Sequence, residues 1–176
     1  MPAPKYIPHY TLNDYRQWEG DWELWEGIPI AMTPSPFGEH QRLVARCSHV
    51  FIEALEKSFC KDCEVFVELD WIISDDTVVR PDLMILCGNI PETFATSAPK
   101  LVIEILSKST RSRDLTSKFE LYERHGVAFY LVLDPDTQET QMWELLDGSY
   151  RFRSPEGSLQ LSHNCSIQLS LKKLHR

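Results

Sequence analysis

The chain has 176 residues, of which 43% are hydrophobic and 25% charged, which is typical of a globular domain with a sizeable core. Its formal net charge of −8 argues against a broad basic surface for tight nonspecific binding of nucleic acid. No apolar run approaches the roughly 18 residues of a membrane span, and the N-terminus lacks the basic-then-apolar order of a signal peptide, so we expect one cytoplasmic domain over residues 1–176.

The first third of the chain predicts a short helix, a hairpin and a long helix. Residues 1–10 contain three prolines and form a loose lead-in, after which Thr11 is expected to cap a helix that reaches Trp18. Apolar and polar residues alternate over residues 22–32, which predicts a β-hairpin that carries Glu23, and residues 34–38 are expected to form a loop. Apolar residues at helical spacing then predict a helix over 39–57, with His40 at the N-terminal end of its buried stripe.

The middle of the chain predicts strands. Residues 64–73 and 78–86 are expected to pair around a turn at 74–77, and a loop over 87–100 leads to a central strand at 101–106. A helix should follow, capped by Ser112 or Asp114 and ending near Gly126.

The last third predicts a strand over 129–133 and a hairpin that joins 141–146 to 150–153 around Asp147-Gly148. The alternating residues 166–171 predict an edge strand.

Two carboxylates lie in strongly apolar surroundings. Side chains alternate along a strand, so Glu104 should share a face with Val102 and Leu106, and a buried glutamate is costly unless a cation or donors satisfy it. Asp82 is likewise flanked by apolar runs. Two buried acids on neighbouring strands can hold one hard cation through oxygen ligands.

The helix after this strand carries one lysine on its apolar flank. At 100° per residue, Leu115, Phe119 and Tyr122 cluster on one face, and Lys118 lies beside them. Such a lysine either extends outward to solvent or meets a buried carboxylate. Glu104 is the nearest candidate by topology.

These motifs resemble the PD-(D/E)xK nuclease core, and more closely the Uma family of restriction-endonuclease-like proteins. The resemblance covers roughly residues 20–145 and rests on motifs in the same order: Trp22-Glu23, Glu39-His40, Arg80-Pro81-Asp82, Leu101-Val-Ile-Glu104-Ile-Leu-Ser107, Arg113-Asp114, Lys118, Tyr122, Gly126-Val127, Tyr130 and Leu133-Asp134-Pro135. It implies an α/β (or α+β) fold with a mixed central sheet flanked by helices. Leu106 stands where the general nuclease pattern has lysine, so Lys118 would supply that charge.

The resemblance also implies a chemistry. Asp82 and Glu104, with the carbonyl of Ile105, would ligate Mg²⁺ or Mn²⁺ for hydrolysis of DNA phosphodiesters. Lys118 would orient the nucleophile or stabilise developing charge. Glu23 could complete the acidic cluster, and His40 could contact water on the metal or the phosphate.

Each of these residues also has a simpler interpretation. Asp82 could be a turn residue, and Glu104 with Lys118 could form a structural ion pair. His40 could be a cap or a core residue, and Glu23 could be solvated on its hairpin. Asp114 is interpreted as a helix cap rather than a ligand.

Five cysteines, an odd number, favour reduced thiols. Cys60-Lys-Asp-Cys63 is a single CxxC motif, and a zinc site needs two more ligands, for which the sequence offers no second pair. Asp62 and Glu64 oppose the low thiol pKa of a redox pair. We therefore expect two thiols in a loop.

The sequence thus predicts a Mg²⁺-dependent endonuclease that acts on DNA. The alternatives are a non-catalytic module of the same fold that binds nucleic acid or protein, and a metal-dependent hydrolase of another phosphoester.

Lys108, Arg111 and Arg113 are a candidate basic patch. A homodimer is expected, because double-strand cutting is easiest with two sites related by a two-fold axis, and the aromatics near the N-terminus and the C-terminal edge strand are candidate contacts.

Overall fold

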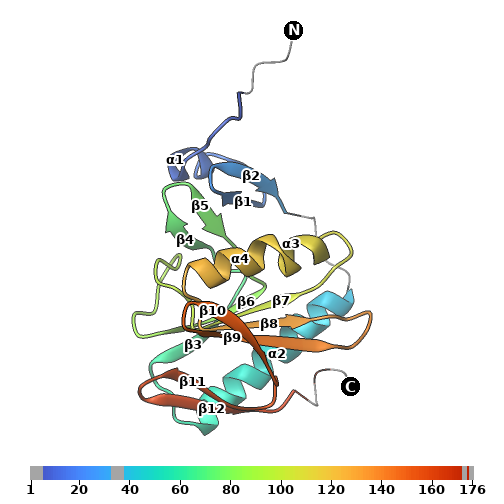
Figure 1. Ribbon diagram of the computed structural model, residues 1–176. Coiled ribbons are helices and arrows are strands. Elements are labelled where there is room, and N and C mark those ends of the chain that lie inside the picture. The colour runs from blue at the N-terminus through green and yellow to red at the C-terminus, as the bar shows by residue number, and fades with distance from the viewer. Residues whose placement is uncertain (1–5, 33–37, 172–173, 175–176) are drawn as a thin grey trace.

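The computed structural model describes residues 6–32, 38–171 and 174, so the predicted loop at 34–38 and the start of the lead-in lie almost wholly outside these residues. Within them, the largest sheet is built from β3 (Cys63–Val67), β6 (Leu83–Cys87), β7 (Leu101–Ile105), β8 (Phe129–Leu133), β9 (Thr140–Leu146) and β10 (Ser149–Arg153). Its order is β10-β9-β8-β7-β6-β3 (Figure 1). β7 and β8 run parallel and the other neighbours antiparallel, so the predicted mixed sheet is confirmed.

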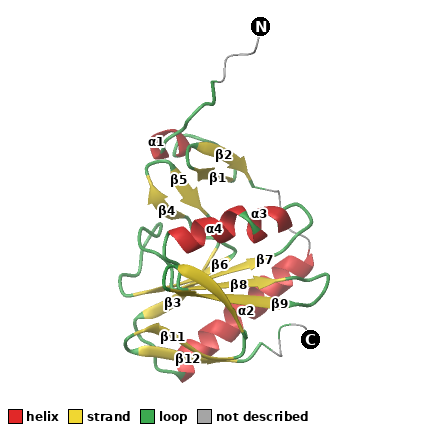
Figure 2. Ribbon diagram, viewed as in Figure 1, coloured by secondary structure: helices red, strands yellow, loops and turns green. Residues whose placement is uncertain are grey.

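Helices cover both faces of this sheet, α2 (Gly38–Lys57) on one side and α3 (Arg111–Leu115) and α4 (Ser117–Arg124) on the other (Figure 2). Alternate side chains of β7 point to the two opposite faces of the sheet. Leu101, Ile103 and Ile105 belong to the core that includes the apolar stripe of α2. Val102 packs in the core of α4, and Glu104 therefore faces α4, as the alternation predicted.

A second sheet, at the N-terminal end of the molecule (Figure 1), contains β1 (Trp22–Trp25), β2 (Ile28–Ala31), β4 (Trp71–Ser74) and β5 (Thr77–Val79) in the order β2-β1-β5-β4. β1 and β2 form the predicted hairpin, with Trp25 opposite Ile28. The preceding helix α1 (Leu12–Tyr15) begins after Thr11 as predicted but ends before Trp18. The Trp18 ring instead contacts the rings of Tyr10, Tyr15 and Trp22.

The long hairpin predicted over 64–86 exists, but it is divided between the two sheets. β3 pairs with β6, and β4 pairs with β5 in the other sheet. The division falls at Glu68, which has φ of +49°, and at Pro81, which has no N–H to donate to a ladder. The N–H of Glu68 donates instead to the carbonyl of Asp82 over 3.2 Å. Asp82 is thereby placed where the two sheets meet.

The helix predicted to run continuously to Arg124 is broken. α3 ends at Leu115 and α4 begins at Ser117, with Thr116 between them at φ −124° and ψ −79°. The residue before α3 is Thr110, so neither Ser112 nor Asp114 is the cap that the sequence predicted. Asp114 lies inside α3 and is buried.

The C-terminal part of the chain adds a two-stranded sheet of β11 (Gly157–Ser162) and β12 (Cys165–Leu169). β12 is the predicted edge strand, whereas β11 was not predicted. Ile167 and Leu169 are buried in the core shared with α2, so this strand does not offer its apolar side chains to a second copy of the chain. The hairpin of β9 and β10 is confirmed; Asp147 and Gly148 both have the positive φ of a tight two-residue turn.

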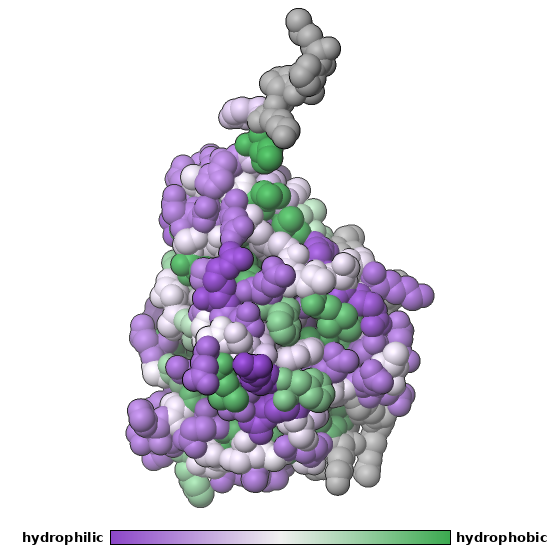
Figure 3. Space-filling model, in the orientation of Figure 1, coloured by the Kyte–Doolittle hydropathy of each residue, from purple (hydrophilic) through white to green (hydrophobic). Residues whose placement is uncertain are grey.

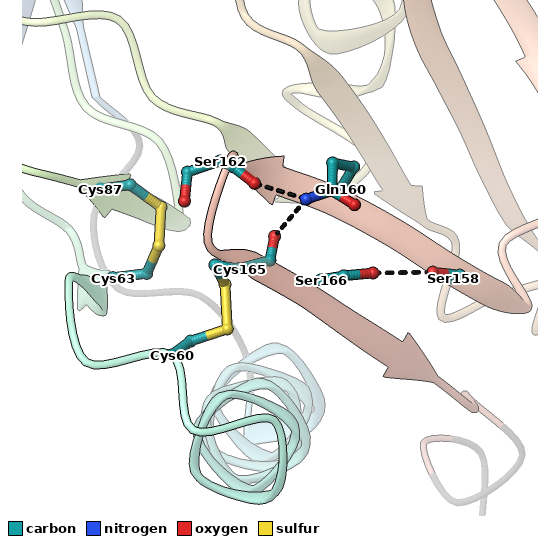
Figure 4. Close-up of a disulfide and its surroundings, with 8 residues drawn as sticks. All are labelled: Cys60, Cys63, Cys87, Ser158, Gln160, Ser162, Cys165 and Ser166. Atoms are coloured by element: carbon teal, nitrogen blue, oxygen red, sulfur yellow. Dashed lines mark hydrogen bonds between the residues drawn. A yellow bond between two sulfur atoms is a disulfide. The ribbon is translucent and has the colours of Figure 1, made fainter.

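The expectation of reduced cysteines is wrong for four of the five. Cys60 is bonded to Cys165 and Cys63 to Cys87, which ties the end of α2 to β12 and β3 to β6 (Figure 4). Cys47 is a free, buried thiol on α2. Sequence spacing could not show these pairs, because 105 and 24 residues separate their members.

The surface mixes residue types: hydrophilic and hydrophobic residues are interspersed over the face shown in Figure 3. Phe152 of β10 is 68% exposed and lies on the outermost strand of the large sheet. None of the helices in the described residues is long and apolar enough to cross a membrane.

Candidate active site

Three acidic side chains surround the ammonium of Lys118 on α4. Its Nζ lies 2.9 Å from Oε1 of Glu104, 3.2 Å from Oε1 of Glu23 and 3.8 Å from Oδ1 of Asp114. All four residues are buried, and the Lys118 side chain is only 9% exposed. Lys118 therefore does not extend to solvent, and its predicted contact with Glu104 is confirmed.

The elements that carry these residues explain their convergence. Glu104 comes from the central strand β7, Glu23 from β1 of the second sheet, and Asp114 from α3. Lys118 and Tyr122 are four residues apart and share one face of α4, and Asp114 approaches Lys118 from α3, on the other side of the break at Thr116. The Tyr122 hydroxyl donates to Oε1 of Glu104 over 2.6 Å. Lys118 and Tyr122 thus hold the same carboxylate oxygen from one helix.

Burial and charge act in opposite directions on these groups. Burial raises the pKa of Glu104 well above its ordinary value, although the Lys118 ammonium lowers it. Burial also raises the pKa of Asp114. Burial lowers the pKa of Lys118, but Glu104 and Glu23 outweigh this effect and raise it, so the lysine stays charged. One ammonium therefore faces an excess of carboxylates, and a second cation or a proton is needed to balance them.

Asp82 lies beside this cluster, in the bend between Arg80 and β6 rather than inside a strand. Its Oδ2 accepts the N–H of Ile105 over 2.7 Å and lies 3.2 Å from Nε2 of His40. The side chain is 19% exposed, so the expectation of a second fully buried acid is wrong. Asp82 is the more open of the two carboxylates predicted as metal ligands, and the backbone of Ile105 lies against it.

His40 projects from the first turn of α2 toward Asp82. Burial lowers the pKa of this imidazole, but the hydrogen bond and charge of Asp82 outweigh burial, and the pKa is raised. Among the described residues, no hydrogen-bond partner reaches its buried Nδ1. His40 is therefore an Asp82 partner rather than a helix cap.

Arg80 joins the second sheet to this site. Its backbone N–H donates to Oε1 of Glu23 over 2.8 Å, and its guanidinium donates to Asp70 and Asp21, each over 2.7 Å. Because Pro81 and Asp82 follow directly, these contacts hold the bend that presents Asp82. Glu23, which the sequence left as a possible solvated residue, is 3% exposed and is part of the cluster.

The chain matches the family model of Uma2, described as "Putative restriction endonuclease", over residues 12–173. It belongs to the Uma2 family. The predicted resemblance is thus confirmed, and the membership supports a nuclease-like function.

Two individual proteins are similar to this Uma2 chain. The uncharacterized protein slr1290 of Synechocystis sp. (strain ATCC 27184 / PCC 6803 / Kazusa) is 25% identical over 181 residues, which cover 98% of this chain and 88% of that protein. A crystal structure of "a putative nuclease belonging to DUF820" from Anabaena variabilis has a TM-score of 0.72 at 22% identity, covering 94% of this chain and 97% of that one. The likeness to the Anabaena variabilis structure shows that the two chains share a fold.

The residue types of the Uma2 site fit a hard divalent cation by their chemistry. In the described parts of the chain, however, no group of three or more His, Cys, Asp or Glu side chains is arranged so that it could hold a metal ion as it stands. Within those parts, the hydrogen bonds to the Asp82 carboxylate fall on Oδ2, and the side-chain hydrogen bonds to the Glu104 carboxylate fall on Oε1. The second oxygen of each carboxylate is the kind of ligand that Mg²⁺ takes. Oδ1 of Asp114, buried and without a hydrogen bond from a described residue, adds negative charge close by.

Sequence reasoning missed two members of the cluster. Asp114 was interpreted as a cap, and Tyr122 was noted only for its place in the family motifs and on the apolar face of its helix. Their four-residue spacing on either side of Lys118 was a signal in the sequence, since i and i+4 positions meet on a helix.

The candidate basic patch loses one of its members. The Arg111 guanidinium donates to both carboxylate oxygens of Asp134, over 2.6 and 2.9 Å. Arg111 therefore anchors the start of α3 to the end of β8, and its charge is already paired.

Proposed function

We propose that this Uma2 protein is an endonuclease that hydrolyses DNA phosphodiester bonds with Mg²⁺ or Mn²⁺. The observation that carries the proposal is the buried Lys118 ammonium held by Glu104, Glu23 and Asp114 beside Asp82. A fold that needed only an ion pair would bury one acid with one lysine, whereas this site buries an excess of acids. Such an excess is favourable when a divalent cation completes it.

The carboxylates of Asp82 and Glu104 and the carbonyl of Ile105 would hold the cation. When bound, it would neutralise phosphate charge and make a water molecule more acidic. The residues support this assignment because a short hydrogen bond fixes each acid. Asp82 accepts the N–H of Ile105 over 2.7 Å, and Glu104 accepts the Tyr122 hydroxyl over 2.6 Å. Ligands held in this way need little rearrangement.

The remaining residues of the site position these acids and hold charge. Lys118 places a permanent positive charge beside Glu104, where it can stabilise negative charge that develops on a phosphate. Tyr122 fixes the rotamer of Glu104, and His40 fixes that of Asp82 through Nε2. Glu23 and Asp114 keep the Lys118 ammonium in place, so they are positioning residues in this proposal.

A cleavage assay tests the function. Single-stranded, duplex and branched DNA would be incubated with purified protein and Mg²⁺ or Mn²⁺, with a metal chelator in a parallel reaction. Cleavage that requires metal and is lost in Glu104→Gln supports the proposal. Glu120→Gln, an exposed acid on the same helix α4, is the matched control and should cleave like wild type.

The alternative function is a binding module without catalysis. Binding of DNA by wild type and by Glu104→Gln alike, with no metal-dependent cleavage of any of the three DNA forms, would establish it in place of the nuclease. The net charge of −8 favours weak engagement of DNA, which a bound divalent cation would strengthen.

We also propose a homodimer, which would supply two active sites for the two strands of a duplex. The structure changes the expected contacts, because the N-terminal tryptophan Trp18 packs in an aromatic cluster and β12 packs on α2. Phe152, 68% exposed on the outermost strand β10, is the better candidate. Light scattering at working concentration should give a dimer mass for wild type and a lower mass for Phe152→Ser. A monomer mass for wild type would contradict the proposal.

A further inference from the structure

Four cysteines from separate parts of the chain meet at the end of the molecule away from the carboxylate cluster. Cys60 follows the last turn of α2, Cys63 begins β3, Cys87 ends β6 and Cys165 begins β12. α2 has 20 residues, hence a length of about 30 Å, with His40 in its first turn and Cys60 beyond its last. The thiols therefore belong to a different site from His40 and Asp82.

The sequence alone offered a single CxxC motif and no further ligand pair. The fold supplies the two missing cysteines. Cys87 is opposite Cys63 in the β3–β6 ladder, with Cα atoms 4.0 Å apart, and Cys165 has its Cα 5.0 Å from that of Cys60. Cys60 and Cys63 flank one turn, so the two pairs lie next to each other (Figure 4). Four thiols in this arrangement match the ligand set of a structural zinc site, including its C-x₂-C spacing.

We propose that Cys60, Cys63, Cys87 and Cys165 bind one Zn²⁺ as four thiolates when both disulfides are reduced. Each disulfide takes two electrons and two protons from one dithiol molecule, which becomes a cyclic disulfide, so two dithiols yield four thiols. Zn²⁺ then replaces the four thiol protons, which are released. In the oxidised protein the sulfurs are bonded in pairs and hold no metal.

Two features of the surroundings fit a metal site of this kind. The turn between Cys60 and Cys63 is held in place independently of the sulfurs, because the N–H of Gly88 donates to the carbonyl of Asp62 over 2.7 Å. A cavity of about 530 Å³ is lined by both Cys60 and Cys63, together with Phe59 and its neighbours. In this proposal a dithiol and a metal ion approach through the cavity, which borders two of the four cysteines, Cys60 and Cys63.

The four cysteines can also hold the fold together, either as two disulfides or as ligands of one zinc ion. The β11–β12 hairpin belongs to neither larger sheet and is tied covalently to α2 through Cys165. In a reducing compartment disulfides are not maintained. A shared zinc ion would then keep the hairpin, α2, β3 and β6 together where thiols alone would not.

Native mass spectrometry of the full chain tests the proposal. Protein reduced with dithiothreitol without oxygen, desalted and given Zn²⁺ should bind one more zinc ion than the oxidised protein. Co²⁺ in place of Zn²⁺ should give the thiolate-to-metal absorption band, which carboxylate ligands do not produce. Cys165→Ser should lose the band, and Cys47→Ala, which changes the free buried cysteine outside this cluster, should keep it.

Equal zinc in the reduced and oxidised wild type, or the absence of the cobalt band from the reduced wild type, would overturn the proposal. This comparison uses wild type alone, so it decides the question even where Cys165→Ser does not fold. It is also independent of nuclease activity, since DNA cleavage is not measured.

Discussion

Nζ of Lys118 lies 2.9 Å from Oε1 of Glu104, in a position where both side chains are buried. An isolated buried ion pair of this kind contributes little to stability, because desolvation of the two charges offsets their attraction. Here the carboxylates of Glu23 and Asp114 add further negative charge at 3.2 and 3.8 Å from the same nitrogen. The cluster thus carries more negative charge than a simple ion pair, and the proposed cation site and a structural ion pair lead to different outcomes for the variants that follow.

Removal of the more open acid should abolish metal binding. We expect calorimetric titration of oxidised protein with Mn²⁺ to show one site in wild type and none in Asp82→Ala, because Asp82 would supply one of the two carboxylate ligands. Asp75→Ala, an exposed acid in the β4–β5 turn, is the control and should bind like wild type. Equal binding by wild type and Asp82→Ala would refute the site.

Neutralisation of the buried acid should abolish cleavage without loss of the fold. Glu104→Gln keeps an oxygen for Tyr122 and Lys118 but removes a charge that burial disfavours. The free energy of unfolding should therefore be unchanged or higher by up to about 2 kcal/mol, and the melting temperature unchanged or raised. Thermal denaturation followed by circular dichroism measures this. A loss of about 3–5 kcal/mol, as when a buried pair is broken, would instead identify a structural ion pair.

Lys118→Met separates charge stabilisation from metal binding. The cleavage rate should fall roughly 10²-fold or more, as it does when one preorganised charge is lost. Mn²⁺ affinity should survive, because lysine is not a ligand. The rate should be measured well below the melting temperature of the variant, since three buried carboxylates lose their cation.

Lys118→Arg is the informative companion variant. It restores the positive charge with a different shape, so partial recovery of the rate is expected. If Lys118→Met cleaves at the wild-type rate, the catalytic assignment rests on the two acids alone.

The ion pair at the start of α3 should give stability that depends on pH. The hydrogen bonds from Arg111 lower the pKa of Asp134 to about 2. A carboxyl with a lowered pKa stabilises the fold above its unfolded pKa of about 3.9 and loses that contribution as the pH falls toward 2. The melting temperature of wild type should exceed that of Asp134→Asn by a constant amount above about pH 5, and the difference should shrink between pH 4 and 2. A difference that is the same at pH 2.5 and pH 6 would contradict this origin.

Local patterns were sufficient for much of the framework. The helix over 39–57, the strand at Glu104 and the hairpin at Asp147-Gly148 follow from periodicity and turn chemistry, which depend only on neighbouring residues. The alternation of β7 also placed Glu104 on the α4 face, and the helical position of Lys118 then predicted their contact. The motifs around Asp82, Glu104 and Lys118 identified the family.

The relations between distant segments were decided by tertiary structure. Periodicity does not record the division of the 64–86 hairpin between two sheets, because the bend at Pro81 depends on Arg80 being held by Glu23, Asp70 and Asp21 from elsewhere in the chain. The burial of Glu23 and the pairing of Cys60 with Cys165 arise in the same way. The sequence by itself determined the acids and the lysine proposed for the site and the four-residue spacing of Asp114, Lys118 and Tyr122. Packing between elements determined that these side chains meet Glu104 and Glu23, because residues far apart in sequence come together only when the sheets and helices dock.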